Sequence, residues 1–192
     1  MSGKKRSKSA AVWATVALAA APVALHAAEV RPAFVAGYDA GGDKIVNVTF
    51  TSGKTDSIRA NEGLYAGGGV SVLNDSKDIE FLGTLSVKYQ GLHADNGDVT
   101  WIRYPLDALF FYRMQSFRLG GGLTYVINPR LKGSGAASNI NTTLDNAAGV
   151  VLQADYLMGK VNLGLRATLL DFKSGGNTIK SNGVGVTFGF TF

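Results

Sequence analysis

The last twelve residues of the chain, SNGVGVTFGFTF (181–192), alternate between two kinds of side chain. Counting back from the end, every second residue is bulky and apolar: Phe192, Phe190, Phe188, Val186 and Val184. Most of the residues between them are glycine or threonine. A period of two predicts a β-strand, and this strand would have one apolar face and one almost bare face.

Seven segments upstream carry the same alternation, so the sequence predicts eight strands. The seven are 32–40, 64–73, 79–90, 102–113, 117–128, 147–158 and 161–169. In the last of these, Leu163 and Leu165 alternate with Gly164 and Arg166.

The connections between these strands are alternately short and long. The short ones are 74–78, 114–116 and 159–160, and the long polar ones are about 41–62, 91–99, 128–146 and 173–179. Up-and-down antiparallel strands place all short turns at one end and all long loops at the other. The sequence therefore predicts an all-β protein with eight antiparallel up-and-down strands. The asparagine-, serine- and glycine-rich stretch 132–146 is expected to be a flexible surface loop.

The first long connection contains an alternation of its own, at Val46, Val48 and Phe50, followed by a Ser-Gly-Lys turn. Segment 44–60 could add strands to the wall, extend its two neighbours or form a separate hairpin. One additional wall strand would make the strand number odd and place the two ends of the chain on opposite sides. We therefore expect a hairpin at about 41–62 that projects beyond the wall, with strand extensions as the alternative.

The first 28 residues have the composition of an export signal. Four basic residues within the first eight precede an apolar, alanine-rich run at 10–25, and the small residues of HAAE (26–29) follow. This order is typical of a cleavable signal peptide, so we expect cleavage after Ala27 or Ala28 and a barrel that occupies 29–192. A membrane anchor is the alternative, although the run is short for a span of about 20 residues.

The net charge of +5 comes mostly from this leader. Four of the 19 lysines and arginines lie there, which leaves 15 basic residues against the 14 acidic ones. A nearly neutral domain does not favour nucleic-acid binding. The chain has no cysteine, so disulfides and thiol chemistry are excluded.

The two faces of the strands differ in charge, and this difference indicates which face is inside. The polar face carries eight charged residues, whereas the apolar face carries almost none. The eight are Glu80, Lys88, Arg103, Asp107, Arg113, Arg118, Asp155 and Arg166. A charge facing lipid at the middle of a bilayer costs about 2–4 kcal/mol, so a transmembrane barrel would turn this face to its lumen. A soluble barrel with the opposite sidedness is the alternative.

The C-terminal stretch VGVTFGFTF resembles the terminal strand that bacterial outer-membrane barrels present to their assembly machinery. With the export signal and eight strands, the chain is broadly similar to the transmembrane domain of outer membrane protein A. WIRYPLDALFFYR (101–113) and FRLGGGLTYVINPRLKG (117–133) also resemble a proteobacterial group of such barrels. The resemblance implies a transmembrane barrel of a Gram-negative outer membrane, with the short turns and both termini in the periplasm and the long loops outside.

The motifs of catalysis and ligand binding are absent from the sequence. His93 is the single histidine after the leader, and no serine stands two residues after it, as in the histidine–x–serine pattern of lipid A deacylases. His93 with Asp95 and Asp98 is not a zinc set, and Asp95-Asn96-Gly97 is foremost a turn sequence. The glycine runs at 66–70 and 119–123 lack the Lys-Ser/Thr pair of a phosphate loop, so we expect them to permit close packing in a narrow lumen.

The sequence thus predicts a non-enzymatic barrel without cofactor or metal, whose lumen is plugged by paired charges. Its expected partners are outer-membrane lipid and lipopolysaccharide, and the barrel assembly machinery through Val184, Val186, Phe188, Phe190 and Phe192. It is expected to be a monomer. The alternative functions are a narrow pore or a transporter of small hydrophobic solutes, and less favoured, a lipid A-modifying enzyme.

Overall fold

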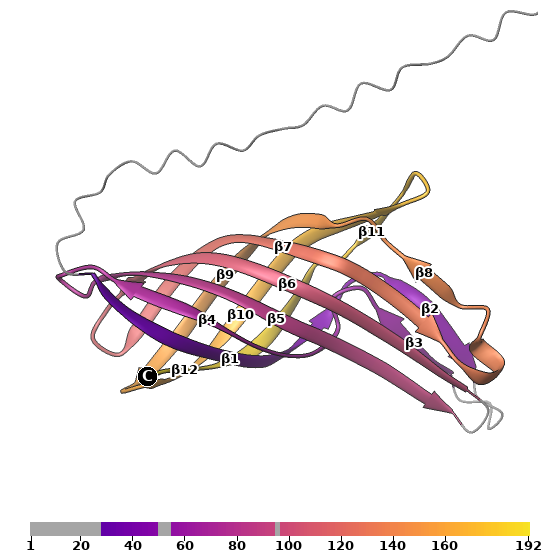
Figure 1. The fold of residues 1–192 in the computed structure, drawn as a ribbon, viewed down its shortest axis with the longest axis horizontal. Coiled ribbons are helices and arrows are strands. Elements are labelled where there is room, and N and C mark those ends of the chain that lie inside the picture. The colour runs from indigo at the N-terminus through magenta and orange to yellow at the C-terminus, as the bar shows by residue number, and fades with distance from the viewer. Residues whose placement is uncertain (1–27, 50–54, 95–96) are drawn as a thin grey trace, which may run out of the picture.

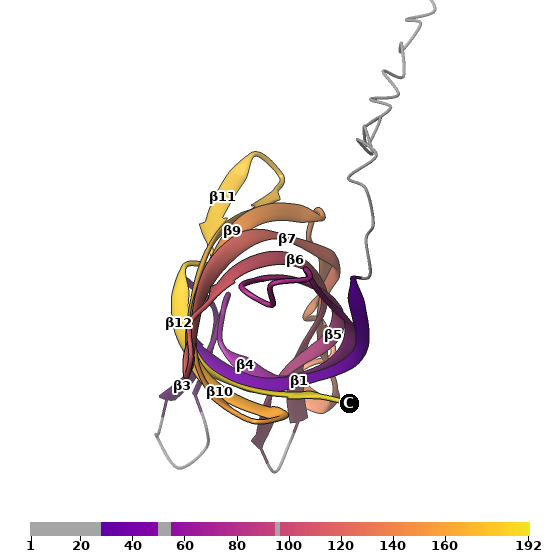
Figure 2. The same cartoon turned by 90° about the vertical axis from the view of Figure 1, so that its left-hand side faces the viewer.

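The computed structural model describes residues 28–49, 55–94 and 97–192, and within them eight strands form a closed antiparallel barrel (Figures 1 and 2). The wall strands are β1 (Glu29–Gly41), β4 (Gly63–Leu73), β5 (Ile79–Ala94), β6 (Gly97–Arg113), β7 (Phe117–Gly133), β9 (Ala147–Met158), β10 (Val161–Ser174) and β12 (Gly183–Thr191). The last strand pairs with the first from Ala33↔Thr191 to Gly41↔Gly183, which closes the wall. The predicted fold class is therefore confirmed for these residues.

The short and long connections lie at opposite ends of the barrel, as predicted. The three short ones join β4 to β5, β6 to β7 and β9 to β10. The C-terminus and the start of β1 lie at the same end (Figure 1). We call this the turn end, and the opposite end the loop end.

Several strands continue beyond their predicted limits at the loop end. β5, β6 and β7 have 16, 17 and 17 residues, whereas β12 has 9. Much of the segments 91–99 and 128–133, which the sequence analysis assigned to loops, is therefore wall strand. The wall is correspondingly taller on the side of these three strands (Figure 1).

The remaining elements are short and lie at the loop end. The predicted hairpin exists as β2 (Lys44–Thr49) and β3 (Thr55–Arg59), which pair only with each other. β8 (Asn141–Thr143) pairs with β7, and β11 (Asn177–Lys180) pairs with β10. A 3-10 turn, η1 (Gly135–Ala137), precedes β8, and Leu144 is buried. The segment 132–146 thus lies largely at the surface, as expected, but it is not a plain loop, because β8 folds back on the extended β7.

The sidedness of the wall agrees with the prediction. Leu165 exposes 68% of its surface, whereas the neighbouring Arg166 exposes 9%. Most other large apolar side chains of the alternating register are likewise exposed, among them Phe110, Leu123 and Val184. The bulky register therefore covers the outside, and the charged register faces the interior.

One β-bulge interrupts the register between β6 and β7. Ile102 pairs with Arg130 and Tyr104 with Ile127, so β7 has two residues, Asn128 and Pro129, where β6 has one. Asn128 has a φ of +49°, which is typical of bulges and tight bends. Beyond the bulge the faces of β7 are exchanged: Leu131 is buried inside and Arg130 is exposed.

The predicted signal peptide at 1–28 lies, except for its last residue, outside the described residues. In the described part of the chain, no helix has the length and apolarity that a membrane span requires.

Candidate functional site: the barrel interior

The interior of the barrel is filled by four successive layers of side chains. From the turn end these are a salt-bridge layer, an apolar layer, a second charged layer with a small cavity, and an apolar layer at the mouth. All eight lumen charges predicted from the sequence point inward.

The first layer is a network of four charged residues near the turns. Glu80 accepts hydrogen bonds from Arg113 and, at 2.7 Å, from Arg118. Arg118 also donates to Asp155 at 2.7 Å. Ser71 donates to Glu80 at 2.6 Å, and Gln153 donates to Asp155 at 3.0 Å. Because two cations face two carboxylates, this layer is neutral and its buried charges are paired.

Glycine makes room for this network. A Cβ atom on Gly164 would lie 1.8 Å from the Asp155 Oδ1 atom, so any larger residue would displace the carboxylate. Close packing of this kind was expected from the sequence for the glycine runs 66–70 and 119–123, and Gly164 lies outside both.

The second layer is apolar and lies directly above the network. It consists of Ala33, Leu82, Leu109, Phe111 and Val151, with Val35 packed against them. The Arg118 guanidinium lies over the Phe111 ring, 4.3 Å from its centroid, which joins the two layers by a cation–π contact.

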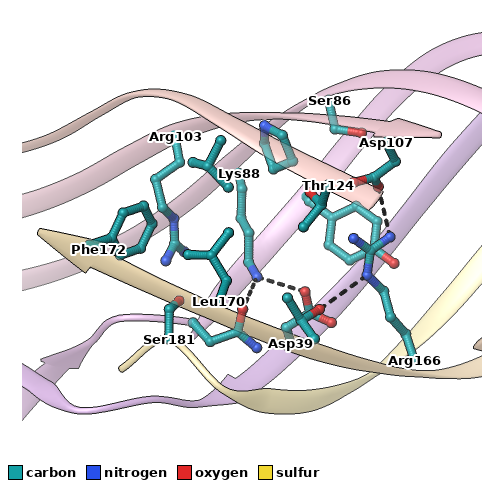
Figure 3. A pocket seen from close by; sticks show the side chains of 15 residues that line it. Asp39, Ser86, Lys88, Arg103, Asp107, Thr124, Arg166, Leu170, Phe172 and Ser181 are labelled. Atoms are coloured by element: carbon teal, nitrogen blue, oxygen red, sulfur yellow. Dashed lines mark hydrogen bonds and ion pairs between the residues drawn. The ribbon is translucent and has the colours of Figure 1, made fainter. Parts of the chain in front are cut away.

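The third layer contains three cations and two carboxylates (Figure 3). Lys88 donates to Asp39 at 2.6 Å and to the side-chain oxygen of Asn61 at 3.0 Å. Arg166 donates to Asp107 at 2.8 Å. Asp39 was missed in the sequence analysis, although its position beside Tyr38 in an alternating segment could have placed it on the inner face.

Arg103 is the cation of this layer without a carboxylate partner among the described residues. Its guanidinium donates to the backbone oxygens of Ala60 and Glu62 and lies 5.1 Å from the centroid of the Trp101 ring. The expectation that Arg103 pairs with an acidic residue is therefore wrong. The chain that returns from the hairpin supplies the acceptors instead, and no periodicity in the sequence indicates that contact.

The fourth layer is an apolar cluster that combines the wall with the hairpin. Wall side chains of β6, β7 and β10 surround Trp101 and Phe172, whose rings meet edge to face at 5.9 Å between centroids. Ile58 of β3 is completely buried among them, and Ile45, Val46 and Val48 of β2 pack against the cluster. The hairpin therefore does not simply project beyond the wall; its apolar side chains close the mouth.

The cavity in the third layer has a volume of about 20 Å³, which is room for about one water molecule. Unbonded buried atoms at its edge include the Nδ2 of Asn61, the Nε of Arg103 and one carboxylate oxygen each of Asp39 and Asp107. This mixture of donors and acceptors suits water, which both donates and accepts hydrogen bonds.

His93 lies apart from the lumen, on the outer face of β5. It is exposed and pairs in register with Asp98, to which Ser134 donates a hydrogen bond at 3.5 Å. No described hydroxyl group bonds to His93, and Ser86 is buried on the inner face. The described residues contain no cluster of three or more metal-ligating side chains. Asp95 lies outside the described residues.

Comparison with known proteins adds evidence about the fold. No family profile matches the chain, and no curated protein matches it in sequence. Among solved structures, Neisserial surface protein A superposes with a TM-score of 0.51 at 12% identity, over 85% of this chain and 96% of that chain. This likeness concerns the fold alone, because the identity is low.

Two further solved structures match with lower scores. OmpT, an outer membrane protein of Vibrio cholerae, has a TM-score of 0.30 at 14% identity, over 83% of this chain and 52% of that chain. The N-terminal β-barrel domain of Pseudomonas aeruginosa OprF has a TM-score of 0.31 at 13% identity, over 84% of this chain and 97% of that chain.

The chain has the fold of a small outer-membrane barrel. Its exterior also matches that of an outer-membrane barrel. On β6 the outward residues from Ile102 to Tyr112 carry no charge, and at about 3.4 Å per residue and a tilt of about 45° they cover roughly 24 Å of height. An apolar band of about 25 Å is typical of such barrels.

Aromatic side chains flank this band at both ends of the outer-membrane barrel. At the turn end, Phe117 and Tyr156 meet with ring centroids 5.0 Å apart, and Tyr112 is also exposed. Toward the loop end, Tyr89 and Tyr125 are exposed on the outer face. Such belts lie at the two interfaces of a bilayer, so fold and exterior together are those of a protein of the bacterial outer membrane.

Proposed function

We propose that the protein is a non-enzymatic barrel that stabilises the cell envelope and presents its loop end to the outside. The observation that carries this proposal is the filled interior. Two apolar layers and a neutral salt-bridge layer cross the lumen, and the cavity between them has only about 20 Å³. An eight-stranded barrel is about wide enough for side chains to fill, and these side chains leave little room for a solute.

Planar-bilayer recording tests the plugged lumen directly. Purified protein inserted into a bilayer should give no stepwise conductance at moderate voltage. In the same preparation, the unboiled protein should migrate differently from the boiled protein on an SDS gel, because a folded transmembrane barrel resists SDS. Reproducible single-channel steps from folded protein would refute the structural role.

A narrow pore is the second candidate, and the hairpin is the observation that favours it. The side chains that close the mouth come partly from a two-stranded sheet that is separate from the wall. Below it, the third layer has one cation more than it has carboxylates. If the hairpin moved and the second layer opened, anions would pass more readily than cations. An anion-selective reversal potential in a salt gradient would support this candidate.

A lipid A-modifying enzyme is the least favoured candidate. His93 on the outer face lacks a bonded hydroxyl nucleophile among the described residues, and nucleophilic catalysis needs one within hydrogen-bond reach. Mass spectra of lipid A from cells that overexpress the protein, or its His93→Ala variant, should be unchanged. A new lipid A species that depends on His93 would overturn this view.

A further inference from the structure

The outer face of β7 carries two cations, Arg130 and Lys132, just beyond the bulge. Both side chains are exposed, and within the described parts of the chain neither forms an ion pair. Their neighbours across the strands are Ile102 and Thr100 on β6, and Thr143 and Asn141 on β8. Three of these four neighbours carry a hydroxyl or amide group, and none of the four is a carboxylate.

Two shallow hollows lie on either side of this pair. The first, of about 250 Å³, is lined by Arg130 and Lys132 with residues 141–143 of β8. The second, of about 260 Å³, is lined by the same two cations with Thr100, Tyr104 and Asn128 among others. Both hollows therefore combine two positive charges with neutral hydrogen-bonding groups, which is the environment that a phosphate prefers.

The height of the pair relative to the aromatic belt is decisive. Arg130 lies beside Ile102, two residues beyond Tyr104, and Lys132 lies beside Thr100, four residues beyond it. With about 3.4 Å per residue and a tilt of about 45°, the two stand roughly 5 and 10 Å above Tyr104. Tyr89 of the belt also pairs with Ile102, so Arg130 is in register with the belt and Lys132 lies beyond it. The polar headgroup zone of a bilayer begins at that height.

We propose that Arg130 and Lys132 form a binding site for the phosphate groups of an outer-leaflet glycolipid. Arg130 would contact a phosphate at the edge of the hydrocarbon layer, and Lys132 a second oxygen farther out. Ile102 beside Arg130, and Tyr104 below it, would pack against the lipid's acyl chains. Asp98 lies two residues beyond Thr100, toward the loop-end tip of β6. Because its negative charge repels an anion there, phosphate binding should be centred on Arg130. This inference rests on the proposed placement of the loop end in the outer leaflet.

Native mass spectrometry of the full chain purified in detergent tests the site. The protein is titrated with bisphosphorylated lipid A and with the same lipid after removal of both phosphates. We expect the phosphorylated lipid to bind about tenfold more tightly. Arg130→Gln/Lys132→Gln should remove this preference, whereas Lys173→Gln, which neutralises an exposed cation on β10, should keep it. The charge-conserving Arg130→Lys/Lys132→Arg variant should also keep most of it.

The outcomes separate the site from the proposed function. Equal affinity of the natural protein for both lipids, or a double glutamine variant that retains the preference, would overturn the site. Each variant is first required to show the heat-dependent gel shift, so a folding defect cannot be mistaken for loss of binding. A natural protein that lacks this shift and does not float with outer-membrane vesicles would instead refute the membrane placement itself.

Discussion

Buried ion pairs are the residue-scale feature on which the interior depends. Asp107 exposes 4% of its surface and bonds to Arg166 at 2.8 Å. Removing one partner of such a pair leaves an uncompensated charge buried in the interior, which typically costs about 3–5 kcal/mol. The pairs therefore fix the conformation of the lumen, whatever their net contribution to stability.

Asp107→Ala should accordingly lower the free energy of unfolding by about 3 kcal/mol or more. Urea unfolding in lipid vesicles, followed by Trp101 fluorescence, measures this change. Asp171→Ala, on the exposed face of β10, is the control and should have little effect. An unfolding curve for Asp107→Ala that coincides with that of the natural protein would refute the pairing.

A second residue-scale prediction concerns Asp78 in the β4–β5 turn. Hydrogen bonds from Ser76 and Asn74 hold the pKa of its carboxyl below the ordinary value. The charged form therefore stabilises the folded turn above the pKa of an unfolded aspartate, about 3.9, and this stabilisation is lost as pH falls through the lower folded pKa. In an NMR titration, Ser76→Ala should raise the pKa of Asp78. An unchanged titration curve would argue against the Ser76 contact.

Alternation in the sequence was sufficient to place the eight lumen charges on the inner face, because successive side chains of a strand point to opposite faces of the sheet. It was not sufficient to assign their partners. The acceptors of Arg103 are backbone oxygens of a segment 41 to 43 residues away, and such contacts depend on how the hairpin folds onto the wall.

At the scale of elements, the hairpin closes the mouth through one side of its two strands. Ile58 is fully buried, whereas Asn47 on β2 is exposed. Ile58→Ala should destabilise the barrel by about 2–5 kcal/mol, the usual cost of removing a large aliphatic side chain from a core. Asn47→Ala should be nearly neutral. A hairpin that projected freely into solvent would give the same small effect for both variants in thermal unfolding.

The glycine-rich strands offer a matched test of the narrow lumen. A Cβ on Gly120, on the inner face, would lie 2.6 Å from the Phe111 ring and 2.1 Å from the Phe110 backbone oxygen. On Gly68, which faces outward, it would meet nothing closer than 3.5 Å. Gly120→Ala should therefore cost about 1–3 kcal/mol, and Gly68→Ala should be tolerated. Equal urea midpoints for the two variants would contradict the packing described here.

The strand positions were predictable because the hydrocarbon layer imposes an apolar register. The strand ends at the mouth were not, because that constraint ceases above the bilayer. There β5, β6 and β7 continue with polar outer faces, and Val99 and Trp101 turn inward to form a core with the hairpin. In the sequence, the loss of an apolar outer face at these positions looks the same as the start of a loop.

At the scale of the whole molecule, closure depends on the pairing of β12 with β1. The Phe192 amide donates to the Pro32 oxygen at 3.1 Å, and its ring meets Phe190 edge to face. The side chain itself remains 62% exposed, so it adds little to the packing of the finished barrel. Its proposed role as part of the assembly signal would therefore act before folding is complete.

Deletion of Phe192 separates these two roles. We expect reduced accumulation of heat-resistant barrel in the outer membranes of cells, but a nearly unchanged unfolding transition for protein refolded in vitro. Tyr112→Ala, which removes an aromatic residue of similar exposure at the same end, should assemble normally in cells. Equal assembly of the deletion variant and the natural protein would refute the signal.

The bulge at Asn128 and Pro129 is a place in β7 where the loss of a single amino acid would not reverse the two faces of the strand. Without the extra residue, a single residue of β7 would face Arg103, Arg130 would still pair with Ile102, and both upper cations would stay outside while Leu131 stayed in the mouth. Loss of one amino acid elsewhere in β7 would reverse the faces of the part of the strand beyond it. The neighbouring surface segments, by contrast, can lengthen or shorten without reversing any wall residue. Across natural variants, single-residue deletions within β7 should therefore fall at this dipeptide, and other insertions and deletions at the loop tips.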